Sequence, residues 1–84
     1  MTIQENWALS TARIEEYLQG LGEVREIAAS RYQVGGCEIL LQPAAESRVG
    51  SYSFPRTLVS FSGEEEAVTR FRRQFMIRFL TLGG

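Results

Sequence analysis

The sequence predicts a single α+β domain with the element order α-β-β-β-α, in which two helices pack on one face of a three-stranded antiparallel sheet. Two observations predict this class. Apolar residues recur at helical spacing near both ends of the chain, and the middle third alternates apolar with polar residues between glycine turns. A chain of 84 residues has the length of one small domain. We therefore expect residues 1–84 to form one unit.

The first predicted element is a helix over residues 2–20. Thr2 and Glu5 have the spacing of a capping box, and Gly20 is a typical helix stop. Apolar side chains three, four or seven residues apart would share one face of this helix. They are Ile3, Trp7, Ile14, Tyr17, Leu18 and Leu21.

The start of this helix has an alternative. Ser10 or Thr11 could cap a shorter helix, because both hydroxyls suit the N-cap position. The first nine residues would then form an arm outside the helix.

Three strands are predicted next, over residues 23–33, 37–42 and 56–61. The glycine pair 35–36 supplies the turn of a hairpin between the first two, and Pro43 is expected to end the second. Alternation places two sets of residues on shared strand faces. They are Cys37, Ile39 and Leu41 in one strand, and Thr57, Val59 and Phe61 in the other.

The last predicted element is a helix that begins after Ser62. The Ser62 hydroxyl is the expected N-cap and Glu65 completes a capping box. Large apolar residues fall within one narrow arc of this helix, which we expect to face the sheet. They are Val68, Phe71, Phe75, Phe79 and Leu82.

The composition offers few residues that could catalyse a reaction or form a cross-link. Cys37 is the only cysteine and the chain has no histidine, which excludes an intrachain disulfide and the usual Cys/His zinc sites. All acidic residues are Glu and all basic residues are Arg, so no lysine can form a Schiff base. We expect no enzyme activity, no cofactor, no catalytic residue and no metal site.

The back of the last helix carries apolar residues outside the core arc. We expect Met76, Ile77 and Leu80, with Arg73 at the rim, to form a homodimer interface, because association is the remaining way to stabilise so small a core. The alternative is that these side chains tuck under the first helix or are singly exposed.

Residues 44–54 show neither the helical nor the strand spacing of apolar residues and are expected to form a long loop. Arg48, Tyr52, Phe54 and nearby Arg56 could form an aromatic and guanidinium patch for an unidentified protein partner. The alternative is an ordinary surface connection.

The final residues "TLGG" resemble the C-terminus of ubiquitin-like sulfur carriers. The resemblance implies a β-grasp fold and a terminal diglycine, here Gly83 and Gly84, that is adenylated and converted to a thiocarboxylate. Glycine is slim and flexible enough to thread a partner enzyme's active site. The carriers open with a hairpin and reach their glycines from a strand, whereas this chain is predicted to open and close with helices. The stretch "RFLTL" could instead be a strand.

The α-β-β-β-α order is similar to that of double-stranded RNA-binding domains. That family grips phosphates with lysines at the start of its second helix, whereas the equivalent segment here is "SGEEEAV". Three glutamates there would repel a phosphate backbone, and the net charge of −1 gives no general attraction to nucleic acid. RNA binding is therefore the weakest of the three functional hypotheses.

The sequence thus favours a small non-enzymatic interaction or accessory module that forms a homodimer through its last helix. A carrier modified at its Gly-Gly end is the alternative, and an RNA-binding module the second alternative. The chain shows no secretory signal and no apolar run long enough to span a membrane, so a cytoplasmic location is expected.

Overall fold

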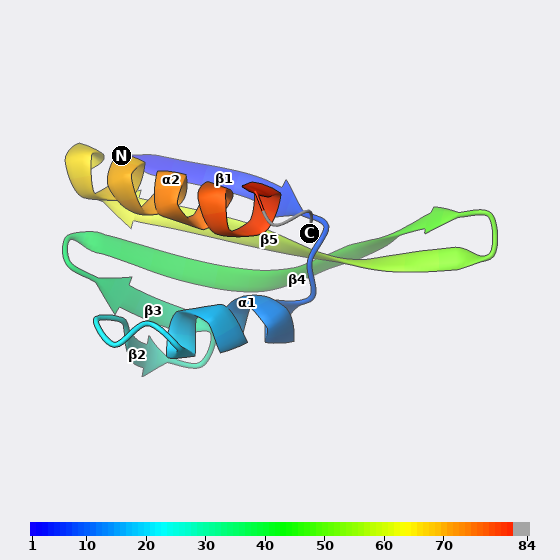
Figure 1. Ribbon diagram of the computed structural model, residues 1–84, viewed down its shortest axis with the longest axis horizontal. Coiled ribbons are helices and arrows are strands. Elements are labelled where there is room, and N and C mark those ends of the chain that lie inside the picture. Colours follow the sequence, from blue (N-terminus) through cyan, green and yellow to red (C-terminus); the bar gives the residue numbers. More distant parts are fainter. Residues whose placement is uncertain (82–84) are drawn as a thin grey trace.

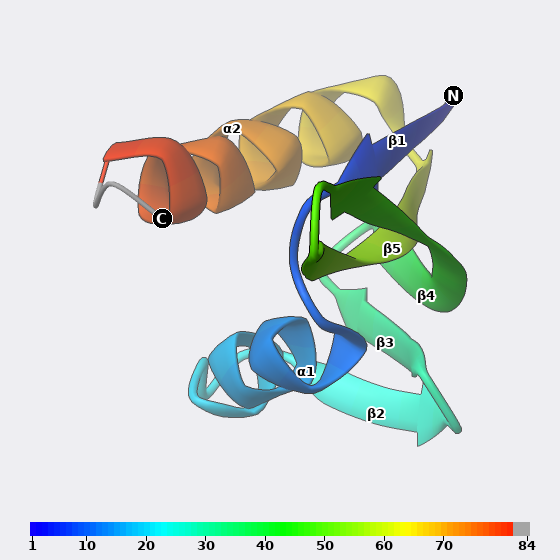
Figure 2. The same cartoon turned by 90° about the vertical axis from the view of Figure 1, so that its right-hand side faces the viewer.

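A computed structural model describes residues 1–81 of the chain and shows one antiparallel sheet of five strands in the order β1-β5-β4-β3-β2, with two helices (Figure 1). Both helices lie on the same face of the sheet and leave the other face open (Figure 2). The elements are β1 (Thr2–Trp7), α1 (Thr11–Gln19), β2 (Arg25–Ala28), β3 (Arg31–Val34), β4 (Cys37–Val49), β5 (Tyr52–Gly63) and α2 (Glu65–Thr81).

The predicted three-stranded sheet is therefore wrong, and so is the helix predicted over residues 2–20. Residues 2–7 form strand β1, which pairs with β5. Ile3 and Trp7 misled the prediction because residues four apart share a face in a strand as well as in a helix. Ser10 caps the shorter helix α1, since its Oγ accepts a hydrogen bond from the Arg13 backbone N–H at 3.2 Å.

The strand predicted over residues 23–33 is a hairpin of two short strands, β2 and β3. Its turn lies at Ala29 and Ser30, and Ser30 has a backbone φ of 58°. This left-handed conformation is common for glycine and uncommon for serine, so the residue at this position does not indicate a turn. The α-β-β-β-α order is lost with this correction, and with it the likeness to double-stranded RNA-binding domains.

The loop predicted over residues 44–54 is also wrong, because β4 and β5 pair along this stretch and turn at Gly50, whose φ is 63°. Pro43 does not end β4. The N–H of Leu41 bonds to Ser30 on the β3 side, so the ring nitrogen of Pro43, two residues on, points the same way. The pairing between β3 and β4 does not extend to Pro43, so the missing N–H of this proline removes no hydrogen bond between the two strands.

Helix α2 begins at Glu65, not after Ser62, which lies in β5 opposite Thr2 of β1. The turn between β5 and α2 requires a glycine. Gly63 has a φ of 136°, and a Cβ at this position would clash with the Gly36 carbonyl oxygen. That oxygen accepts a hydrogen bond from the backbone N–H of Glu64 at 3.2 Å, so the β3–β4 turn fixes where α2 begins.

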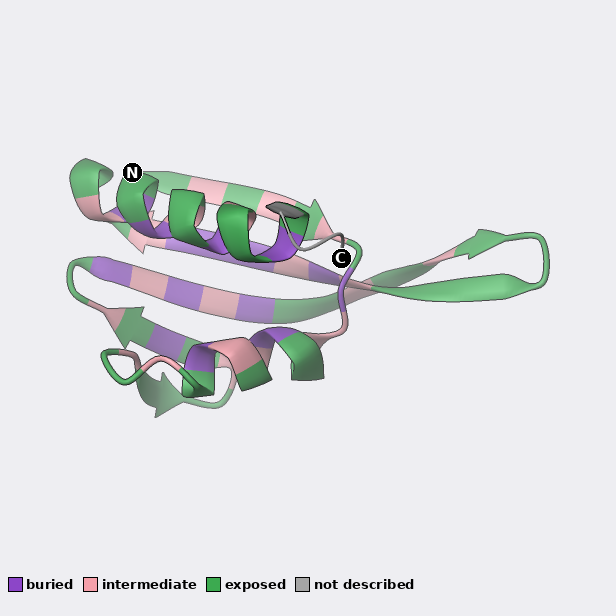
Figure 3. Ribbon diagram, in the orientation of Figure 1, coloured by how far each residue is buried: buried purple, intermediate pink, exposed green. Residues whose placement is uncertain are grey.

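The core lies between the sheet and the two helices. Inner-facing residues of β4 and β5 are buried, and their neighbours along each strand are more exposed (Figure 3). Four of the five residues in the predicted arc of α2 are buried, which confirms that face, and Leu82 lies outside the described residues. The buried hydrophobic residues are Leu9, Ile14, Leu18, Tyr32, Cys37, Ile39, Leu41, Val59, Phe61, Val68, Phe71, Phe75 and Phe79.

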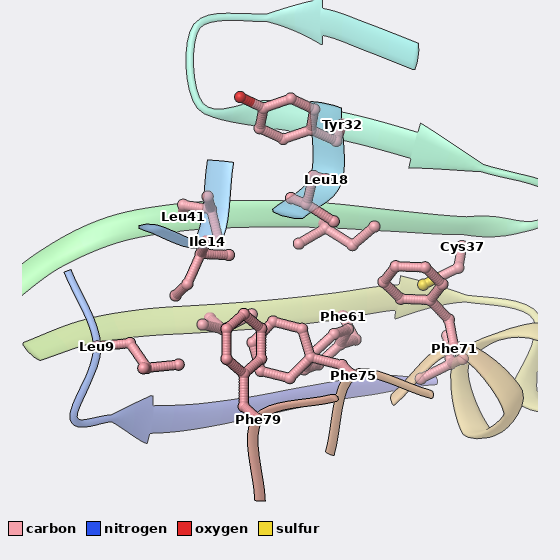
Figure 4. Close-up of a cluster of buried hydrophobic side chains, with 13 residues drawn as sticks. Leu9, Ile14, Leu18, Tyr32, Cys37, Leu41, Phe61, Phe71, Phe75 and Phe79 are labelled. Atoms are coloured by element: carbon pink, nitrogen blue, oxygen red, sulfur yellow. The ribbon is translucent and has the colours of Figure 1, made fainter. Parts of the chain in front are cut away.

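Phe75 joins four elements of this core and is completely buried (Figure 4). Its ring centroid lies 5.0 Å from that of Trp7 in β1 and 5.5 Å from that of Phe61 in β5, both in edge-to-face geometry. Tyr17 of α1, at 6.1 Å, and Phe79, at 4.8 Å, complete the cluster. One side chain therefore holds α2 against the sheet and against α1.

An ion pair forms a second connection between β1 and α2. The Arg72 guanidinium donates to both carboxylate oxygens of Glu5, with its Nε 3.0 Å from Oε1. Both side chains are about two-thirds buried or more. Hydrogen bonding from Arg72 lowers the pKa of Glu5 below its ordinary value of 4.5. The sequence instead predicted a capping box that includes Glu5. Glu5 and Arg72 are far apart along the chain, so no local pattern indicates that they pair.

Replacing Phe75 with alanine should destabilise the domain by about 3 to 5 kcal/mol, the usual cost of removing a buried phenylalanine. This equals most of the stability expected for so small a core, so the variant should be largely unfolded at 25 °C. Circular dichroism with urea titration measures this. The control is Phe54→Ala, since Phe54 is 46% exposed. Equal urea midpoints for the two variants would contradict the central place of Phe75.

The Glu5–Arg72 pair predicts a loss of stability in acid. Because folding lowers the pKa of Glu5, the pair's contribution is complete above pH 4.5 and is lost as the pH falls through the folded-state value. We expect about 1 kcal/mol. Glu5→Gln should lower stability at pH 7 and flatten this acid limb, as measured by thermal unfolding from pH 7 to pH 2. The exposed Glu46→Gln control should behave as wild type; an unchanged acid limb in Glu5→Gln would count against the pair.

Candidate functional site

The outer face of α2 is the most apolar exposed helix surface in the described part of the chain. Ile77 is 54% exposed and Leu80 60%, while Met76 is half-buried and Arg73 is exposed. Together with Thr69 and Arg72 these side chains line an open groove of about 400 Å³. The sequence prediction thus grouped residues that do share one surface. That two copies meet there stays a prediction.

The opposite side of the same helix end packs toward α1, with an open groove of about 480 Å³ between them that Tyr17, Arg78 and Phe79 line. The Phe79 ring is buried and packs edge to face on Tyr17 at 5.2 Å. The Arg78 guanidinium lies 5.9 Å from the centre of the Tyr17 ring, which covers the junction further. Burial raises the pKa of Tyr17, as expected for a phenol that is partly buried at the junction of two helices. The last turn of α2 therefore has one side that packs toward α1 and one open, apolar side.

The β4–β5 hairpin is the second exposed surface, and it extends well beyond the rest of the domain (Figure 1). The structure brings three of the four predicted partner-binding residues to one face and separates the fourth. Tyr52, Phe54 and Arg56 alternate along β5 and share a side. A bulge in β4 between Ala44 and Ser47 shifts the pairing, so Arg48 lies opposite Ser53 on the other side.

Arg56 already has partners within the chain. Its guanidinium donates to the side-chain oxygen of Asn6 at 2.6 Å and to the Ser47 hydroxyl at 3.2 Å. This links the base of the hairpin to β1. Tyr52, at 71% exposure, and Phe54 remain accessible, while Arg56 serves the structure of the hairpin. Binding of a partner by this surface stays a prediction.

The buried titratable side chains have local structural roles. Burial raises the pKa of the Cys37 thiol, which keeps it protonated and unreactive at neutral pH. Burial, with a hydrogen bond of 2.7 Å to Glu15, raises the pKa of Tyr32 to about 12. Within residues 1–81, no three His, Cys, Asp or Glu side chains are grouped so that they could hold a metal ion.

The two glycines of the carrier hypothesis, Gly83 and Gly84, lie outside the described residues. Up to Thr81 the chain is helical, so the interpretation of "RFLTL" as a strand is wrong as far as the structure describes it. The chain reaches the glycine pair from α2, whereas the sulfur carriers that "TLGG" resembles reach theirs from a strand. Among the described helices, none has the length and apolar character needed to cross a membrane.

Comparison with known proteins gives one family. Residues 5–84 match the family described as Archaeal MoaD-like protein, and the match includes both helices, most of β1 and the glycine pair. No curated protein matches the chain. Because the match covers nearly the whole sequence, the chain belongs to the Archaeal MoaD-like protein family.

Proposed function

We propose that this protein is a small sulfur-carrier-type protein that is activated at the carboxylate of Gly84. The observation that carries the proposal is the family match over residues 5–84, since a MoaD-like family suggests a carrier of this type. The "TLGG" sequence, which lies within the matched residues, resembles the C-terminus of the same class. The sequence-based preference for an interaction module has less support than this alternative.

The chemistry requires two co-reactants, ATP and a donor of sulfur at the oxidation level of sulfide. An oxygen of the Gly84 carboxylate attacks the α-phosphorus of ATP and pyrophosphate leaves, which forms an acyl adenylate. The sulfur nucleophile then bonds to the acyl carbon, and AMP leaves with the electron pair of the broken C–O bond. The product is a thiocarboxylate with the transferred sulfur. Its use of ATP suits the cytoplasmic location that the sequence predicts.

In this scheme the protein is a substrate and the catalyst is a separate enzyme. Gly83 and Gly84 have no side chain to obstruct a narrow active site. The chain also has no lysine, so no ε-amine of its own can attack the activated acyl group. Cys37, its one thiol, is buried and protonated and does not compete with the sulfur donor.

The architecture departs from that implied by the resemblance to ubiquitin-like carriers. They open with a hairpin, whereas here β1 is followed by α1 and pairs with the distant β5. The proposal therefore rests on the family match and the glycine pair, and takes no support from strand order.

Self-association is a competing proposal for the outer face of α2. It is supported by the exposure of Ile77 and Leu80, which a second copy would cover. A homodimer of this kind is compatible with the fold and does not by itself assign an activity.

The carrier proposal is tested by intact-mass spectrometry of the protein purified from its own source organism. We expect a fraction of the molecules to show the mass gain of one sulfur-for-oxygen exchange, which fragmentation should locate at Gly84. The same chain made by cell-free synthesis without a sulfur donor is the control and should show the unmodified mass. The proposal would be refuted if every molecule from actively growing cells carried an unmodified Gly84, or if the native chain continued past Gly84.

A further inference from the structure

The reach of the chain beyond α2 limits where a loading enzyme can sit. In the proposed carrier the loaded residue, Gly84, lies three residues after Thr81, where α2 ends. Even fully extended, these three residues place the Gly84 carboxyl group at most about 12 Å from the helix end. This is an upper limit that holds for any conformation of these residues. An active site that accepts Gly84 must therefore approach the last turns of α2 to within this distance.

The two sides of those turns differ in what they offer such an enzyme. Toward α1, Phe79 packs on Tyr17, and the groove there is lined by the charged side chains of Arg13, Glu16 and Arg78. On the outer side, Ile77 lies four residues before the helix end, about 6 Å along the axis, and Leu80 is closer still. Both are more than half exposed. Among the described residues, these two side chains are the exposed large apolar ones within that distance of the helix end.

We propose that the adenylating enzyme which loads Gly84 docks on the outer face of the last turns of α2, through Ile77, Leu80 and Met76. This inference rests on the proposed carrier function and names the partner and surface it uses. The complementary surface is apolar at its centre and acidic at its rim. Arg73 lies one turn before Ile77 on the same face, and this face has no acidic residue between Thr69 and Leu80.

A second copy of the chain fits this face less well. A symmetric antiparallel pairing centred on Ile77 would set Arg73 of each copy opposite residue 81 of the other, where no acid lies to pair with it. A pairing that instead matched Arg73 with the partner's Glu66 would set Ile77 opposite residue 62, which precedes the helix. The apolar residues would then remain uncovered. Charge complementarity therefore favours an acidic partner over self-association.

The test compares variants of the full chain in extract of the source organism supplied with ATP, with the initial rate of thiocarboxylate formation followed by intact mass. Ile77→Glu and Leu80→Glu should lower this rate by on the order of tenfold or more, because each places a charge against an apolar surface. The matched control is Ile27→Glu in β2, since Ile27 is 42% exposed and lies on the far edge strand of the sheet. It should load as wild type does.

Arg73 supplies a second comparison. Arg73→Glu should slow loading and Arg73→Lys should largely preserve it, if an acidic rim faces this residue. Leu80→Ala, which only shortens the apolar side chain, should also slow loading, but by less than Leu80→Glu does. Circular dichroism should show every variant folded, because the substituted side chains are not in the core.

The outcomes separate the two proposals. Loading of wild type and Ile77→Glu at equal rates would overturn the docking surface and leave the carrier function in place. Absence of loading for wild type would overturn both. Light scattering adds the self-association outcome: a wild-type dimer that Leu80→Glu converts to a monomer would assign this face to a second copy and overturn docking of the enzyme. We expect a monomer of 9.5 kDa.

Discussion

The fold depends above all on the packing of Phe75 between the sheet and α1. The ring contacts Trp7 from the first strand and Phe61 from the last, two residues on the same face of the sheet, with Phe61 opposite Ile3 and Trp7 opposite Thr57. Tyr17 covers it from α1. A domain of this size has one core, so a side chain of α2 that contacts three other elements fixes their relative positions. The remaining contacts, including the Glu5–Arg72 pair, strengthen an arrangement that this cluster determines.

A consequence for function is that the C-terminal end of α2 has a fixed position on the domain. Phe79 extends the cluster by one turn and packs on Tyr17, so the helix is anchored within two residues of Thr81. Anchoring on the inner side leaves Ile77 and Leu80 on the outer side. In the proposed function the glycine-ended segment therefore follows a helix end that is fixed on the domain and has an apolar outer face, and the enzyme supplies the catalytic groups.

Sequence patterns predicted the parts of the fold that depend on local periodicity. The buried face of α2, the inner residues of β4 and β5 and the alternative start at Ser10 all follow from side-chain spacing and capping. The errors have physical causes. A four-residue spacing in β1 fits a strand or a helix, and the turn at Ser30 contains no glycine. The bulge that moves Arg48 to the other face of the hairpin depends on pairing with a distant strand, which local sequence does not encode.

The candidate site was likewise predictable from the sequence only in part. The helical wheel placed Met76, Ile77 and Leu80 on one exposed face, but only the tertiary structure shows that Phe79 packs on Tyr17 on the opposite side. Amide hydrogen exchange along α2, followed by NMR, tests this anchoring most directly. The account predicts that amides from Phe75 to Phe79 exchange as slowly as those in the centre of β5, because all open only with the core. Protection that ends at Phe75, with a rapidly exchanging last turn, would contradict it.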